Sequence, residues 1–96
     1  MRIFIAGPTL GREDTYKAVF AAAADTIRKG GHEPVNPVAI ELGENADRAD
    51  YITAALDALW SADAIYLLPG WRDSDLAQAQ ARIAELRGMR RFGVTA

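Results

Sequence analysis

The chain contains no cysteine, and this absence excludes several kinds of chemistry. Without thiols it has no disulfide, no thiolate nucleophile and no cysteine-based metal site. The single histidine, His32, would need carboxylates as partners to hold zinc. We therefore expect neither a bound metal nor a cofactor.

The sequence also lacks a basic excess and a long apolar run. Eleven Lys and Arg residues stand against 13 Asp and Glu, a net charge of -2, which argues against binding of a nucleic-acid polymer but not of a single nucleotide. No segment approaches the roughly 20 apolar residues that cross a bilayer. Met1 to Phe4 lead directly into a strand instead of a signal peptide. We therefore expect a cytoplasmic protein that does not associate with a membrane.

What is present fits one small α/β domain over residues 1–96. Half of the residues are hydrophobic, as in ordinary globular proteins. Apolar, β-rich runs alternate with stretches of helical spacing, and Gly and Pro separate them. The predicted strands are Arg2–Ala6, an edge segment within His32–Pro37, the central Ala64–Leu68 and Arg91–Val94. The predicted helices begin at Asp14 or Thr15, at Arg48 and at Ser74, and end before Gly30, near Ser61 and at Arg87.

Each predicted helix carries an apolar stripe that should face the sheet. In the first helix the stripe is Tyr16, Val19, Phe20, Ala23 and Ile27. In the second it is Ile52, Ala55, Leu56, Leu59 and Trp60, and in the third it is Leu76, Ala79, Ile83 and Leu86.

Alternating strands and helices predict a doubly wound, mostly parallel sheet of flavodoxin-like type, with the strand order 2-1-3-4. In that order the topological switch lies between the first and the central strand. The loops 7–14 and 69–74 then face each other across one cleft, which is where such sheets bind ligands. Residues 38–45 show no periodicity and are expected to form a loop with at most one helical turn.

The candidate binding residues follow from this cleft. Gly7 and Gly70 either let a ligand approach the backbone or simply end strands. Trp71 should be at least partly exposed, and it either stacks on a base or plugs the helix start. Ser74 is a helix cap that can also contact a ligand, whereas Asn36 either points at a ligand or caps the next loop. Asp73 and Asp75 would repel a phosphate at this helix start unless Arg12 or Arg72 compensates.

Several motifs carry a family resemblance at matching spacing: IFIAGP at 3–8, GHEPVNP at 31–37 and ADAIYLLPGW at 62–71, followed by Ser74. Together they resemble the DUF4406 proteins, often phage-encoded, of the nucleoside 2-deoxyribosyltransferase-like superfamily. The resemblance implies a pocket for a nucleoside or nucleotide, with Gly7, Pro8 and Thr9 on its first loop. It also implies a homo-oligomer in which a neighbouring chain completes the pocket.

In active members of the superfamily, a glutamate on the helix after the central strand attacks the anomeric carbon and an aspartate on the preceding helix assists the leaving base. On the matching positions this chain has Gln80 and Ala55, and Leu76 replaces a glycine. Gln80 lies about 40° around the helix from Leu76, at the margin of the apolar stripe, while Asp57 is rotated about 200° from Ala55. A carboxamide has no anionic oxygen, so Gln80 can hydrogen-bond a ribose hydroxyl but cannot act as the nucleophile.

These residues predict a nucleoside- or nucleotide-binding protein with a degenerate deoxyribosyltransferase-like site. One alternative is an active deoxyribosyltransferase or N-glycosidase in which Asp73, Asp75 or Glu13 supplies the carboxylate. Another is an interaction module that retains only the fold and uses Trp71 as a contact residue.

Overall fold

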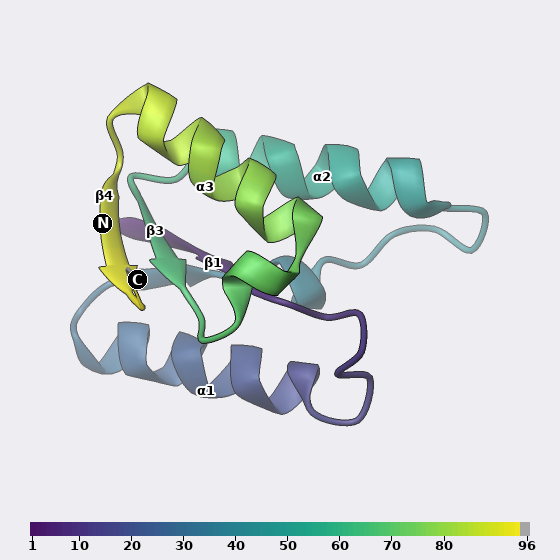
Figure 1. The fold of residues 1–96 in the computed structure, drawn as a ribbon, viewed down its shortest axis with the longest axis horizontal. Coiled ribbons are helices and arrows are strands. Elements are labelled where there is room, and N and C mark those ends of the chain that lie inside the picture. Colours follow the sequence, from purple (N-terminus) through teal and green to yellow (C-terminus); the bar gives the residue numbers. More distant parts are fainter. Residues whose placement is uncertain (95–96) are drawn as a thin grey trace.

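Four parallel strands form one sheet in the order β2-β1-β3-β4 in the computed structural model, which describes residues 1–94. The expected α/β class and strand order are confirmed. Helix α1 covers one face of the sheet, while α2 and α3 lie together on the other (Figure 1). The strands are β1 (Arg2–Ala6), β2 (Glu33–Val35), β3 (Ala64–Leu67) and β4 (Arg90–Gly93), and the helices are α1 (Tyr16–Lys29), α2 (Arg48–Trp60) and α3 (Asp75–Arg87).

The two central strands carry the core on both faces of the sheet. Ile3 and Ile5 of β1 face α1, whereas Phe4 lies between them in sequence and faces α2 and α3. Both sides are buried, which is why β1 and β3 are continuous apolar runs without polar alternation. β2 contains Pro34 and lies at the edge, as a strand with a missing N–H donor should.

The helices on the crevice side begin at well-formed caps. At α2, the Asp47 carboxylate accepts from the Asp50 N–H at 2.9 Å and the Asp50 carboxylate accepts from the Asp47 N–H at 3.1 Å. At α3, the Ser74 hydroxyl accepts from the Ala77 N–H at 3.1 Å. These caps set where each helix starts, and both starts lie at the rim of the cleft described below.

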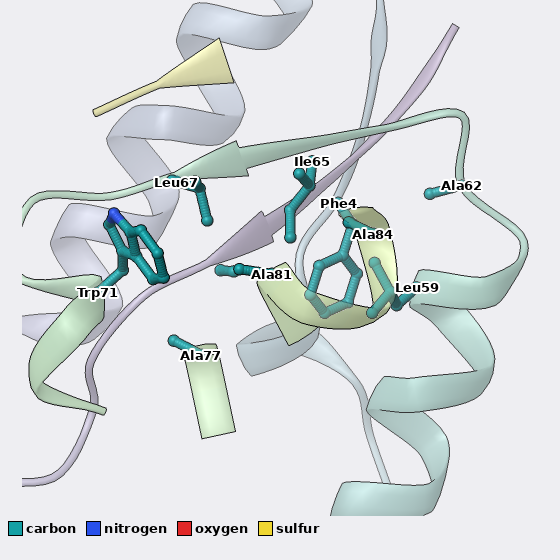
Figure 2. Packing of buried hydrophobic residues seen from close by; sticks show 10 residues of the cluster. Phe4, Leu59, Ala62, Ile65, Leu67, Trp71, Ala77, Ala81 and Ala84 are labelled. Carbon is teal, nitrogen blue, oxygen red and sulfur yellow. The ribbon is translucent and has the colours of Figure 1, made fainter. Parts of the chain in front are cut away.

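The buried face of α3 is shifted by about one residue from the predicted apolar stripe. The residues that face the sheet are Ala77, Gln80, Ala81 and Ala84, while Leu86 is 71% exposed and Ala79 is also exposed. Figure 2 shows the reason: the indole of Trp71 packs beside Ala77 and Ala81, below β3. A large ring at that place leaves room only for alanines, so the helix turns its small residues inward.

The two tryptophans lie opposite to expectation. Trp71, expected to be at least partly exposed, is 5% exposed, because the left-handed Gly70 (φ 83°) turns the chain into the short 3-10 helix η2 (Trp71–Asp73) and folds the ring under α3. Trp60, expected in the core, is 62% exposed at the end of α2, and the Arg87 guanidinium covers its ring at 4.9 Å. Val19, expected to face inward on α1, is also exposed.

The segment after β2 contains one short 3-10 helix, η1 (Pro37–Ala39), which agrees with the expected loop and single turn. No helix within residues 1–94 combines the length and the apolar character needed to cross a membrane. In the same part of the chain no group of three or more His, Asp or Glu side chains is placed to hold a metal ion.

Candidate functional site

A crevice opens at the carboxyl ends of β1 and β3, at the topological switch of the sheet. Its outer cavity has a volume of about 160 Å³ and lies between the loop after β1 and the first turns of α2 and α3. A second cavity of about 190 Å³ extends toward α1, and a small one of about 20 Å³ lies deeper. Thr9 and Tyr51 line all three, so the cavities are parts of one crevice.

Two glycines set the path of the backbone in the loops after β1 and β3. A Cβ on Gly7 would lie 2.8 Å from two atoms of the Leu68 side chain, so only glycine lets the β1 loop pass so close to the end of β3. Gly70 has φ +83°, and a Cβ there would lie 2.9 Å from Arg12 Nη2. Both residues therefore have a backbone role, and Gly7 also lines the deep cavity.

Gln80 is the only buried polar residue of the described chain, with 4% of its surface exposed. It reaches the deep cavity, whose walls also include Thr9, Tyr51 and Ser74. None of the hydrogen bonds within residues 1–94 involves its side-chain amide, and the amide atoms are not fully enclosed, so they open into this cavity. Since a buried amide carries two donors and an acceptor oxygen, this side chain offers hydrogen bonds to whatever occupies the cavity.

The start of α3 carries mixed charge. Asp73 and Asp75 line the outer cavity together with Arg48. Arg12 pairs with Asp73 at 3.3 Å and so compensates one of the two carboxylates. The helix N-terminus attracts anions, but the remaining Asp75 opposes this attraction. The outer cavity is therefore suited to hydroxyl and amide groups more than to a highly charged polyphosphate.

Tyr51 and Arg48, on the first turn of α2, are site residues that the sequence did not indicate. Burial raises the pKa of the Tyr51 hydroxyl, and the neighbouring Tyr16 raises it further, while Arg48 opposes the shift. The phenol therefore stays protonated and can donate a hydrogen bond into the crevice. The available signals were the place of Tyr51 among the residues that carry the family resemblance and its position at the start of a helix whose cap, Asp47, lies at the cleft.

Some expected site residues do not reach the crevice. Asn36 serves as a cap, because its side-chain oxygen accepts from the Val38 N–H at 3.2 Å. Trp71 lines a different concavity, on the side of α3 that faces β4. Ala55 is fully buried and lines none of the three crevice cavities. The remaining candidates divide into two groups: Gly7, Thr9, Ser74 and Gln80 come together in the deep cavity, whereas Pro8 lines a separate cavity beside α1 and Gly70 lines none of the crevice cavities.

Glu13, a candidate carboxylate, has a local role. It accepts a hydrogen bond from the Gly11 N–H at 3.0 Å and braces its own loop. Its own backbone N–H and that of Gly11 lower the pKa of the carboxyl. The group is therefore ionised near neutral pH, and it does not line the crevice cavities.

Residues 1–91 match the sequence profile of a family described as a domain of unknown function, DUF4406. The chain belongs to the DUF4406 family. The match covers all four strands except the last two residues of β4, so this DUF4406 domain includes every residue of the crevice. No match is found among curated proteins.

Solved structures with the same fold include a 2-deoxyribosyltransferase from the psychrotolerant bacterium Bacillus psychrosaccharolyticus, with a TM-score of 0.73 and 17% identity over 97% of this chain and 71% of that one. A conserved protein from Enterococcus faecalis V583 is similar at a TM-score of 0.68 and 17% identity. That comparison covers 97% of the DUF4406 chain but only 62% of the other. The DUF4406 domain thus has the fold of a 2-deoxyribosyltransferase.

Proposed function

We propose that this DUF4406 protein binds a nucleoside or nucleotide in the crevice between β1 and β3 and does little or no glycosidic chemistry. The observation that carries the proposal is Gln80: a buried amide without a partner that lines the deepest part of the crevice. An amide that opens into the cavity can exchange hydrogen bonds to water for hydrogen bonds to a ligand hydroxyl or base edge.

The surrounding residues support a ligand of this kind. Thr9, Ser74 and Tyr51 add hydroxyl groups, and Leu76 and the tyrosine rings add apolar surface. A nucleoside presents the same combination, with hydroxyls on the sugar and an apolar, hydrogen-bonding base. The 2-deoxyribosyltransferase of the same fold makes this ligand class the natural first choice.

The proposed loss of glycosidic chemistry rests on the side chains at the two positions that the family resemblance assigns to the catalytic carboxylates. Glycosyl transfer uses one carboxylate to attack or stabilise the anomeric carbon and a second group to handle the proton of the leaving base. Gln80 has no anionic oxygen, and Ala55 has no polar group at all. Loss of a nucleophile typically costs many orders of magnitude in rate, while the pocket itself can stay intact.

The test is a thermal-shift screen of the purified protein with deoxynucleosides, ribonucleosides and their monophosphates. A ligand at about 100 times its Kd stabilises the folded state by about 2.7 kcal/mol, which is a clear rise in Tm for a domain of this size. Gln80→Leu should abolish the rise. For the unphosphorylated nucleosides Gln78→Leu is the matched control, because Gln78 lies on the same helix but outside the crevice. No stabilisation by any compound would count decisively against the proposal.

A second function, slow release of the base, is favoured by one observation: Asp75 lines the outer cavity without an ion-pair partner within residues 1–94. Chromatography of deoxynucleosides incubated with the protein measures it. Base release that disappears in Asp75→Asn would establish the enzymatic activity. If the natural protein releases no base, the result favours binding without catalysis. The interaction module that relies on Trp71 loses its contact residue, because that ring is buried.

We also propose a homo-oligomer. Its support is an exposed apolar surface at the ends of α2 and α3, where Trp60 is 62% and Leu86 is 71% exposed. Light scattering gives the mass directly: a multiple of one chain that falls to one chain in Trp60→Ser fits the proposal, and a single-chain mass of the natural protein rejects it.

A further inference from the structure

The side of α3 that faces β4 carries a second concavity, separate from the crevice. It has a volume of about 260 Å³ and its lining includes Trp71, three arginines and one glutamate: Arg72, Arg82, Arg91 and Glu85. Arg82 and Glu85 pair with each other at 2.9 Å. The concavity therefore has a net charge of about +2, in a protein whose overall charge is -2.

Arg72 and Arg91 converge on the same ring. Their guanidinium carbons lie 4.5 Å and 5.7 Å from the centroid of the Trp71 indole. Within residues 1–94, neither has a carboxylate at ion-pair distance. The two guanidinium groups repel each other, and an anion bound between them would attract both and offset this repulsion.

The ring itself supplies the second observation. Trp71 Nε1 is buried and has no hydrogen-bond partner within the part of the chain that the structure describes. In Figure 2 this nitrogen lies at the end of the ring toward β3, away from Ala77 and Ala81. A buried tryptophan N–H normally has an acceptor, so a ligand oxygen that reaches this donor would satisfy it.

We propose that this concavity binds a phosphate group. Guanidinium forks match the oxygens of phosphate in bidentate geometry, and a tetrahedral phosphate has enough oxygens to accept from both arginines and from the indole N–H together. Arg72 and Arg91 are exposed residues, so their guanidinium groups are free to turn from the ring toward an anion in the concavity. Gln78 steadies Arg72 by donating a hydrogen bond from its amide to the Arg72 carbonyl.

The site is independent of the nucleoside crevice. Trp71 and Ala81 line the concavity, whereas Gln80, next to Ala81 in sequence, turns to the other side of the helix. Phosphate binding here would give the protein a second ligand, either a free phosphate or the phosphate of a nucleotide that is held by its charged end.

The indole N–H signals of ¹⁵N-labelled protein provide the test, because the chain has only two tryptophans. Trp60→Phe assigns the two signals. Inorganic phosphate, pyrophosphate and a nucleoside monophosphate are titrated in turn at constant ionic strength, with chloride and the unphosphorylated nucleoside as controls. We expect the Trp71 signal to move downfield and to saturate, while the Trp60 signal stays in place.

Variants make the result specific to the site. Arg91→Gln and Arg72→Gln should each weaken phosphate binding about tenfold or more, since a charge-assisted hydrogen bond is lost. Arg90→Gln is the matched control, because Arg90 stacks on Phe92 instead and lies outside the concavity. Saturation by inorganic phosphate identifies free phosphate as the ligand, and saturation by the nucleotide alone identifies a nucleotide phosphate. No saturable shift, an equal effect of chloride or of the bare nucleoside, or an unchanged affinity in Arg91→Gln would overturn the proposal.

Discussion

Replacing Gln80 by glutamate exchanges the side-chain amide nitrogen for an oxygen. This single change tests both the burial of the side chain and the chemistry of the crevice. The side chain is 4% exposed and lies beside a cavity of about 20 Å³, room for about one water molecule. A carboxylate placed there loses most of its hydration. We expect Gln80→Glu to destabilise the fold by about 1–3 kcal/mol near neutral pH.

The destabilisation should depend on pH in a defined direction. Burial raises the pKa of the introduced carboxyl in the folded state above its unfolded value of about 4.3. The folded variant then holds its proton to higher pH than the unfolded chain does. The penalty is therefore absent below about pH 4 and grows by about 1.4 kcal/mol per pH unit up to the folded pKa.

Thermal melts of the natural protein and Gln80→Glu between pH 4 and pH 8 measure this effect. For a domain of this size each kcal/mol lowers Tm by about 4–8 °C. Ala79→Glu, at an exposed position on the same helix, should show no growing gap. A Gln80→Glu gap that is constant across pH would refute the burial of this side chain. If the same variant releases bases from deoxynucleosides while the natural protein does not, the crevice holds a substrate without a nucleophile.

Further predictions concern residues around the crevice. Gly7→Ala should cost about 1–3 kcal/mol by calorimetry, since its Cβ would meet the Leu68 side chain at 2.8 Å, and an unchanged Tm would show that Leu68 yields freely. Asp47→Ala should cost about 0.5–2 kcal/mol in chemical denaturation through loss of the α2 cap, whereas an unaltered midpoint would contradict that capping role. The ultraviolet absorbance of tyrosinate should rise late for Tyr51, above its ordinary pKa of about 10, and Tyr51→Phe should remove that late step; titration of all tyrosines together at or below that value would be the opposite result.

The fold was predictable because its signals are local and agree with one another. The apolar runs of β1 and β3, the Gly and Pro breaks after them and the helical spacing between them lead to one parallel sheet with its switch at these two strands. Pro34 also placed β2 at the edge. Even the cap of α3 at Ser74 follows from a residue type whose preference is strong.

The orientation of individual side chains was harder to predict, and the tryptophans show why. A ring after a strand end is usually exposed, but the left-handed turn at Gly70 returns Trp71 to the core, and that ring then decides which residues of α3 can face inward. Trp60 is the last residue of α2 and is 62% exposed, although its neighbour Leu59 on the expected stripe is fully buried. Tyr51 and Arg48 reach the crevice only because α2 begins there, a relation between distant segments that no local pattern contains.

The most direct test of nucleoside binding is a map of chemical shifts in ¹⁵N-labelled protein during titration with the nucleoside or nucleotide that stabilises it most. We predict saturable changes of the Gln80 side-chain amide and of the Thr9 and Ser74 backbone amides, with the Trp71 indole unaffected by an unphosphorylated ligand. Changes confined to other surfaces, or none at ligand concentrations that saturate the thermal shift, would contradict a binding site in this crevice.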